Sequence, residues 1–325
     1  MNSTKGANAT AGTSLTVALC THNHKERLGR TLRGVAQLVA PGCPWELLIV
    51  DNASTDGTSQ LVMTSDWRMP GMNVRVVREE KLGLSNARNR AIEEATGEYI
   101  VFMDDDESPD PHWLGAYERI ILAERPDALG GRIEVMFEDG RRPTWLQDEL
   151  LGFLGQLDHG GAARRLTAPD TPIFGGNFAF RKDIFARIGT FDAELGRKGS
   201  DNTGGEDTEI YRRMIASGCN VWWVPNAVIH HRIQAGKLRR RYFLDLHFRQ
   251  GRAQGMRKRG AASRIPPRYL IPQLWRALKV ALLVRLSRGP DAALRTQMNV
   301  AYFLGYVYGW ACGKDDIEKV RLAHR

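Results

Sequence analysis

The sequence YIVFMDDD at residues 99–106 joins an apolar run to three consecutive aspartates and decides the fold. The branched and aromatic residues from Tyr99 to Met103 predict a buried parallel strand that ends at these acidic residues. Open α/β sheets bind ligands at the carboxyl ends of their strands. Clustered carboxylates repel one another unless a cation lies among them, and Mg²⁺ or Mn²⁺ usually binds through one or two carboxylates and the phosphates of a substrate. Taken alone, the three aspartates fit either a metal–diphosphate site or a solvated acidic loop.

The segments around this stretch alternate between strand-like and helix-like patterns. Predicted strands cover residues 15–20, 45–50, 73–77 and 99–103, and predicted helices cover residues 25–40, 59–66 and 85–95. This alternation predicts a parallel sheet with right-handed crossovers. Asp51 and Asp104 each follow a predicted strand, so both side chains should project into one crevice. The chain lacks a Gly-x-Gly-x-x-Gly after the first strand and a Gly-Lys-Ser/Thr loop, which argues against a dinucleotide dehydrogenase and a P-loop NTPase.

Four segments resemble the family 2 inverting glycosyltransferases of GT-A fold. They are residues 17–24 (VALCTHNH), 48–58 (LIVDNASTDGT), 83–89 (GLSNARN) and 102–106 (FMDDD) with 111–114 (PHWL), and they occur in the family's order. The resemblance implies a Rossmann-like α/β fold, that of the nucleotide-diphospho-sugar transferases, with helices flanking a mixed sheet. It also implies a glycosyltransferase that uses a nucleoside-diphosphate sugar.

The resemblance implies a role for individual residues of these segments. Thr21 and Asp51 would hold the nucleotide base, with Asp51 accepting hydrogen bonds from the base edge. Asp104 would face the ribose or the metal, and Asp105 stands beside it among the donor-binding residues. Asp106 would bind the Mn²⁺ or Mg²⁺ ion that bridges the donor diphosphate.

Two further positions have competing interpretations. Arg88 could contact the diphosphate, or it could form a salt bridge on its own helix. A neutral imidazole can complete the ligand shell of Mn²⁺, and His230 and His231 are the candidates. Relatives carry a histidine here two residues before an Ile or Val, and this resemblance selects His231 over His230.

An acidic sequence, Glu206-Asp207-Thr-Glu209, follows the glycine-rich segment at residues 196–205. The dipole of a helix by itself favours acidic residues in the first turn. The family, however, carries an acidic pair after a glycine-rich loop, and its second acid is the general base. That role falls on Asp207, which would take the proton of the acceptor hydroxyl as its oxygen attacks and inverts the anomeric carbon. The glycine-rich segment should be mobile and close over donor and acceptor.

Size and composition bound the organisation of the chain. The 325 residues are 42% hydrophobic, enough for one large core or two smaller ones, and no apolar stretch reaches the roughly 18 residues of a membrane-spanning helix. We expect a disordered lead-in at 1–14, a GT-A catalytic domain at 15–232 and a basic amphipathic helical extension at 233–325. Within the catalytic domain, 15–110 would bind the nucleotide sugar and 111–232 the acceptor. Four scattered cysteines indicate reduced thiols in a cytoplasmic protein.

Positive charge is concentrated in one block. The net charge is +9, and residues 232–268 contain twelve Lys and Arg residues against one acid, Asp245. Such a block indicates an anionic partner, either phospholipid or nucleic acid. Basic amphipathic helices with aromatic residues follow it, and they favour peripheral attachment to the inner face of the plasma membrane over a helical bundle packed on the catalytic domain. We expect no nucleic acid, because the carboxylates of the crevice would repel a polyanion.

The predicted function is a metal-dependent inverting glycosyltransferase in the synthesis of a surface polysaccharide or glycoconjugate. It would transfer a single sugar from a nucleoside-diphosphate sugar, with UDP as the expected nucleotide, to a glycan or lipid-linked acceptor. The chain lacks the Gln-x-x-Arg-Trp sequence and the following membrane spans of processive synthases. The alternatives are a nucleotidyltransferase of related fold, whose glycine-rich signature is absent at residues 20–24, and a nucleic-acid-binding protein, which steep salt dependence would reveal.

Overall fold

The computed structural model describes residues 13–64, 67–68, 71–168, 170–197, 204–259 and 265–323. Residues 1–12 of the predicted lead-in and 198–203 of the predicted mobile segment lie outside the described residues. The chain forms two compact units. The sheet unit contains Met1–Glu134 and Gly155–Arg232, and the helical unit contains Val135–Leu154 and Ile233–Arg325.

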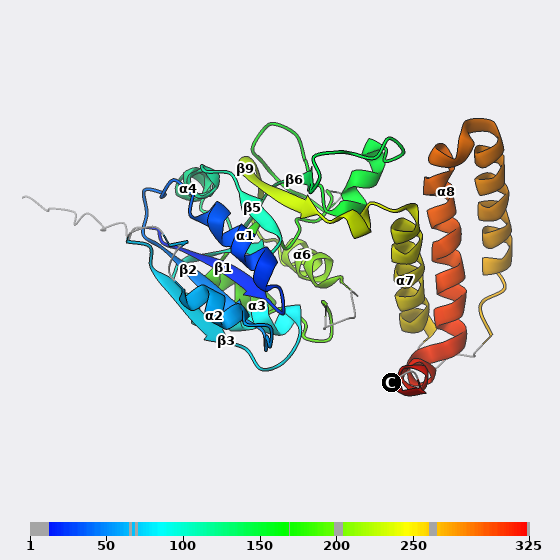
Figure 1. The fold of residues 1–325 in the computed structure, drawn as a ribbon, viewed down its shortest axis with the longest axis horizontal. Coiled ribbons are helices and arrows are strands. Elements are labelled where there is room, and N and C mark those ends of the chain that lie inside the picture. The colour runs from blue at the N-terminus through cyan, green and yellow to red at the C-terminus, as the bar shows by residue number, and fades with distance from the viewer. Residues whose placement is uncertain are drawn as a thin grey trace, which may run out of the picture. The chain divides into compact units, whose positions relative to one another are not determined.

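A mixed sheet of nine described strands has the order β3-β2-β1-β4-β8-β6-β9-β5, with β7 paired to β9 (Figure 1). The strands are β1 (Leu15–Thr21), β2 (Trp45–Asp51), β3 (Val74–Arg78), β4 (Tyr99–Asp104), β5 (Glu107–Pro109), β6 (Ala128–Phe137), β7 (Arg164–Arg165), β8 (Phe178–Arg181) and β9 (Val221–Ile233). The first four run parallel to one another, and β8 joins β4 in the antiparallel direction. This arrangement confirms the predicted mixed α/β sheet.

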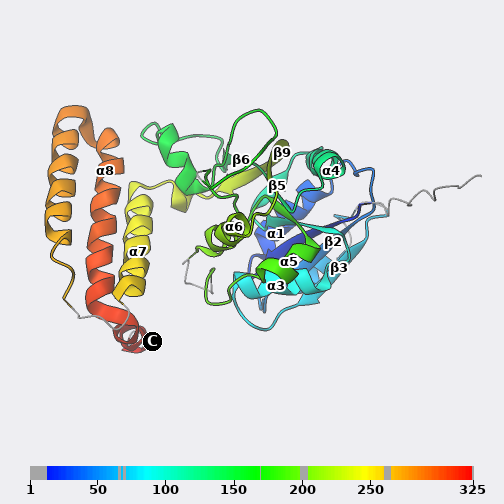
Figure 2. The same cartoon turned by 180° about the vertical axis from the view of Figure 1, so that it is seen from behind.

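Helices cover both faces of the sheet. They are α1 (Lys25–Val35), α2 (Thr58–Met63), α3 (Leu84–Glu94), α4 (Trp113–Glu124), α5 (Phe185–Ile188) and α6 (Glu206–Ala216), with the 3-10 turn η2 (Lys182–Ile184). Figures 1 and 2 show α1 on one face, and α3 and α5 on the other. Because both faces are covered, every residue of β1 is buried, which explains the continuous apolar run at its centre.

Two local features complete the description of the sheet unit: a helix that is shorter than predicted and an aromatic cluster in the core. The helix predicted over 25–40 ends at Val35. The Gln37 and Leu38 N–H groups bond to carbonyls three residues back, and the Val39 N–H bonds to the Pro111 carbonyl at 2.8 Å. An aromatic cluster fills the core beneath β4, where Phe102 contacts Phe178 and Phe180 edge-on at centroid distances of 5.3 and 6.1 Å. Edge-on aromatic pairs of this kind add to the stabilisation from apolar burial.

The helical unit consists of α7 (Arg240–Arg259), α8 (Leu270–Ala323) and the 3-10 helices η1 (Asp148–Leu154) and η3 (Ala235–Lys237). Leucines of η1 pack in one apolar cluster with Phe243 of α7 and with Leu294 and Met298 of α8. Gly289 adopts a positive φ of 84° directly before Pro290, and α8 turns back on itself as two arms (Figure 1). None of the described helices combines the length and apolar character needed to cross a membrane.

Glycines allow α7 and the second arm of α8 to approach closely. Gly251 and Gly255 lie one turn apart on α7, and Gly305 and Gly309 lie one turn apart on α8. A Cβ on any of the four would lie 2.0–2.1 Å from a backbone oxygen of the facing helix. Side chains larger than hydrogen therefore cannot occupy these positions without separating the two helices.

Candidate active site

The carboxyl ends of three neighbouring strands bring the predicted donor-binding residues together. Thr21 of β1 is in register with Asp51 of β2, and Cys20 of β1 is in register with Asp104 of β4. Thr21, Asp51 and Asp104 therefore lie at one edge of the sheet, as the apolar runs before them predict.

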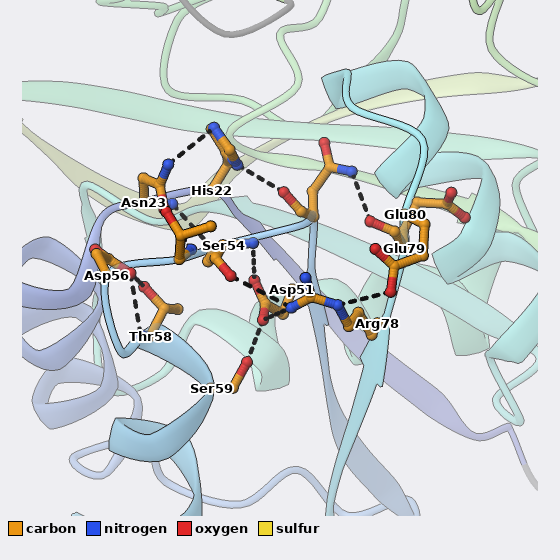
Figure 3. Close-up of polar contacts among 12 residues, drawn as sticks. His22, Asn23, Asp51, Ser54, Asp56, Thr58, Ser59, Arg78, Glu79 and Glu80 are labelled. Atoms are coloured by element: carbon orange, nitrogen blue, oxygen red, sulfur yellow. Dashed lines mark hydrogen bonds and ion pairs between the residues drawn. The ribbon is translucent and has the colours of Figure 1, made fainter.

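Asp51 is buried and its carboxylate is held by its own chain (Figure 3). One oxygen accepts the Ser54 backbone N–H at 3.1 Å, and the other accepts the Ser59 hydroxyl. The Arg78 guanidinium adds an ion pair at 3.2 Å and reaches in from the end of β3. The Arg78 side chain is 45% exposed, so it is the one partner of the three that can leave without disturbing the fold.

Asp105 contacts the end of β1 and the residue that precedes α1. Its carboxylate accepts the Thr21 hydroxyl at 2.7 Å and contacts His24 Nδ1 at 2.9 Å. Burial raises the pKa of Asp105, although the hydrogen bond and charge of His24 act in the opposite direction. Both contacts are made by the same carboxylate oxygen, Oδ2, and through it Asp105 orients the Thr21 hydroxyl.

Arg88 joins Asp104 to the acidic pair of α6. Its guanidinium is 2% exposed and lies 3.3 Å from Asp104, 3.1 Å from Glu206 and 2.8 Å from Asp207. The rings of Phe178 and Phe191 lie 5.3 and 5.4 Å away. Because all three carboxylates belong to β4 and α6, this is a salt-bridge network between elements rather than a salt bridge within the helix of Arg88.

Asp207 combines an ion pair, a hydrogen bond and a perturbed pKa. One oxygen faces Arg88 and the other accepts the Gly175 backbone N–H at 3.0 Å. Burial raises the pKa of Asp207 to about 6, the charge of Glu206 adds to this effect, and Arg88 opposes it. A Cβ on Gly175 would lie 2.1 Å from Arg88 Nη2, so the close approach requires glycine. A carboxylate with this pKa can accept a proton near neutral pH.

Asp106 and His231 face each other across the pairing of β5 with β9. His231 is in register with Glu107, and its Nε2 lies 3.5 Å from an oxygen of Asp106. His230 points elsewhere, with its Nδ1 3.7 Å from Glu134.

This pair suits a divalent cation only together with a substrate. Within the described residues, no group of three or more His, Cys, Asp or Glu side chains could hold a metal ion. One carboxylate and one imidazole match the usual mode of Mg²⁺ and Mn²⁺ binding, in which substrate phosphates and water supply the remaining ligands.

Sequence reasoning missed two charged residues of this site. Glu107 is buried, and its carboxylate accepts the Asp104 N–H at 2.9 Å. Burial and the charges of Asp104 and Asp106 raise the pKa of Glu107 well above its usual range. Desolvation would lower the pKa of Arg197, but the charges of Asp104, Asp106 and Glu206 raise it. The four-acid run at 104–107 was the available signal for Glu107, whereas no local pattern distinguishes Arg197.

The chain also resembles solved structures and characterised relatives. The mannosyltransferase PcManGT from Pyrobaculum calidifontis, solved with GDP-Man and Mn²⁺, superposes with a TM-score of 0.58 at 19% identity over 93% of this chain and 88% of that one. GalNAc-T7, solved with UDP, GalNAc and Mn²⁺, gives a TM-score of 0.55 at 18% identity over 77% of this chain and 51% of that one. At these identities, the likeness establishes the GT-A fold.

Sequence relatives include glycosyltransferase AglE from Haloferax volcanii, which is 25% identical over 56% of this chain. The chain spans 57% of the length of AglE. The succinoglycan biosynthesis protein ExoM from Rhizobium meliloti is 24% identical over 74% of this chain and 73% of its own length.

Two family models match the chain. A model described as the N-terminal domain of galactosyltransferase matches residues 157–235. The model described as glycosyl transferase family 2 matches residues 16–189, more than half of the chain, and this range carries the strand-end aspartates and Arg88. The chain belongs to glycosyl transferase family 2.

Proposed function

We propose that this glycosyltransferase is metal-dependent and inverting, and that it transfers a single sugar from a nucleoside-diphosphate sugar to a hydroxyl of a glycan or lipid-linked acceptor. UDP is the expected nucleotide. The observation that carries the proposal is the environment of Asp207, whose carboxylate has a pKa near 6 and is tied through Arg88 to Asp104 at the donor edge of the sheet. Family membership removes the nucleotidyltransferase alternative.

Asp207 would act as the general base. With a pKa of about 6, it is roughly nine-tenths ionised at pH 7. Its carboxylate would remove the proton of the acceptor hydroxyl while that oxygen forms a bond to the anomeric carbon. The bond from this carbon to the diphosphate breaks on the opposite side, which inverts the configuration. Arg88 and the Gly175 N–H hold the general base in position throughout.

The other site residues would bind the donor. Thr21 and Asp51 would hold the nucleotide base, Asp104 would face the ribose or the metal, and Asp105 would take part in donor binding while it positions the Thr21 hydroxyl. Asp106 and His231 would hold a divalent cation, Mn²⁺ or Mg²⁺, which when bound offsets the charge that develops on the leaving diphosphate.

Substitution of Asp207 by asparagine tests the general base. The asparagine side chain can still accept the Gly175 N–H through its amide oxygen but cannot take a proton, so kcat should fall by about 10²–10⁴-fold while donor affinity persists. Glu209→Gln is the matched control, because Glu209 lies in the same first turn and pairs with Arg213 on the helix surface. Near-native turnover of Asp207→Asn would move the role to Glu206.

Calorimetric titration with UDP, GDP and dTDP, with Mn²⁺ and with chelator, tests the donor half independently. We expect one nucleotide to bind in a metal-dependent manner. Asp106→Asn should abolish the metal dependence, because it removes the carboxylate that faces His231. Failure of all three nucleotides to bind, with or without metal, would contradict the donor assignment.

The proposal extends to the organisation of the chain and its setting. Residues 15–110 would bind the nucleotide sugar, residues 111–232 the acceptor, and residues 233–325 would form the basic extension. Surface polysaccharide synthesis is supported by the name of ExoM, a succinoglycan biosynthesis protein. A cytoplasmic enzyme at the inner face of the plasma membrane is supported by the basic block at 232–268, in which Arg241 is 89% exposed.

A further inference from the structure

The first arm of α8, residues 270–288, carries an exposed apolar stripe. The outer stripe consists of Ile271, Trp275, Leu278, Leu282 and Leu286. Intervals of three and four residues place these side chains on one face of the helix. Their exposed fractions lie between 40% and 76%. A different face of the arm packs within the unit, where Leu270 is buried against Tyr306 and Trp310 of the second arm. The outer stripe is therefore not needed to hold the two arms together.

The first arm and the residues just before it carry five basic residues and no acidic ones. The basic residues are Arg268, Arg276, Lys279, Arg285 and Arg288, and residues 268–290 contain no Asp or Glu. At 100° per residue, Lys279 and Arg285 flank the stripe on its two sides. Trp275 stands within the stripe near the start of the arm and presents an amphipathic indole ring to solvent. A contiguous apolar face with a cationic border marks an interaction surface rather than an ordinary solvated helix.

We propose that the first arm of α8 lies in the interface of an anionic lipid bilayer, with the outer stripe among the acyl chains and the bordering cations at the level of the phosphates. This inference rests on the proposed membrane setting and assigns it to one helix face. The bases of α7 could attract a membrane only through charge, which salt screens. The arm adds apolar insertion, which salt does not remove.

The charge pattern favours lipid over a second copy of the chain. A symmetric dimer formed through the outer stripe would bring two cationic borders together with no acidic residue between 268 and 290 on either copy. Like charges in contact oppose association, whereas anionic head groups neutralise the same residues.

Flotation of the full chain with phospholipid vesicles tests the proposal. One set of vesicles is phosphatidylcholine alone, and the other contains about one-third phosphatidylglycerol. The double variant Leu282→Asp/Leu286→Asp places two carboxylates in the outer stripe, at positions that are 58% and 76% exposed. Leu122→Asp is the matched control, because Leu122 is 61% exposed on α4 of the sheet unit.

We expect the wild type and Leu122→Asp to float with the anionic vesicles, and the double variant to lose at least about tenfold in binding. Binding of the wild type should weaken at high salt but persist in part. Unchanged binding of the double variant would overturn the proposal, as would a vesicle-free dimer that the double variant dissociates. Calorimetric titration of the double variant with nucleotide separates the two proposals, because donor binding should match the wild type whatever the vesicles show.

Discussion

Arg78 and Arg88 each pair with an aspartate that ends a strand, but their environments are opposite. Arg88 is 2% exposed and binds carboxylates from two other elements, whereas Arg78 is 45% exposed and divides its guanidinium between Asp51 and Glu80. Breaking a buried ion pair is costly, and an exposed pair exchanges readily with solvent. The Asp207 region, where we propose that the proton is transferred, is therefore assembled in advance. The Asp51 region, where we propose that the nucleotide base binds, keeps a cation that can move.

Removal of Arg88 should have the largest effect on stability. Arg88→Ala leaves Asp104, Glu206 and Asp207 close together without their shared cation, so the free energy of unfolding should fall by about 3–5 kcal/mol in urea titration. Arg90→Ala on the same helix removes a half-buried pair with Glu94 within the helix and should cost about 1 kcal/mol or less. Equal losses of unfolding free energy for Arg88→Ala and Arg90→Ala would contradict the special cost of breaking the buried Arg88 network.

The pH dependence of kcat/KM should report the ionisation of Asp207 directly. Asp207 must be ionised to act as a base, so kcat/KM should fall about tenfold per pH unit below its pKa of about 6 and level off above it. The stability of the protein should depend on pH in the opposite direction. Because folding raises the pKa of Asp207 from 3.8, the contribution of this residue to the free energy of unfolding is complete below pH 3.8. It is lost as the pH rises through about 6. If the pH profile of the control variant Glu209→Gln lacked the fall in kcat/KM below pH 6, that fall would belong to Glu209, and Asp207 would not be the general base.

Removal of Arg78 should have the smallest effect. Because the Ser54 N–H and the Ser59 hydroxyl still bind Asp51, Arg78→Ala should lower the free energy of unfolding by less than about 1 kcal/mol. Donor affinity measured by calorimetry should not fall, since in the proposed donor complex the nucleotide base would take the place of Arg78 on the Asp51 carboxylate. A loss of stability as large as that of Arg88→Ala would show that the contact between Arg78 and Asp51 is also fixed in advance.

The sequence predicts those parts of the site that depend on local patterns. The apolar runs before Asp51 and Asp104 identify parallel strands, and such strands end at one edge of the sheet, so their convergence follows directly. The Gly-rich segment before Glu206 similarly marks the start of α6. These inferences needed only residues that are close together in the chain.

The remaining features depend on contacts between distant residues. Arg88 and Asp207 are 119 positions apart, and the GLSNARN sequence gives no sign that its arginine pairs with α6. Asp105 stands between two aspartates of the crevice, yet the turn after β4 directs its carboxylate to Thr21, 84 positions away. Residues 135–154 group with helices that begin about a hundred positions later.

The membership of Val135–Leu154 in the helical unit affects how the protein is made. The leucines of η1 find their apolar partners in Phe243, Leu294 and Met298, which leave the ribosome long after them. At about 5–20 residues per second, Met298 is synthesised roughly 7–30 s after Leu150. During that interval the leucines of η1 lack their apolar partners, so the nascent chain carries an uncovered apolar segment until the helical unit is complete.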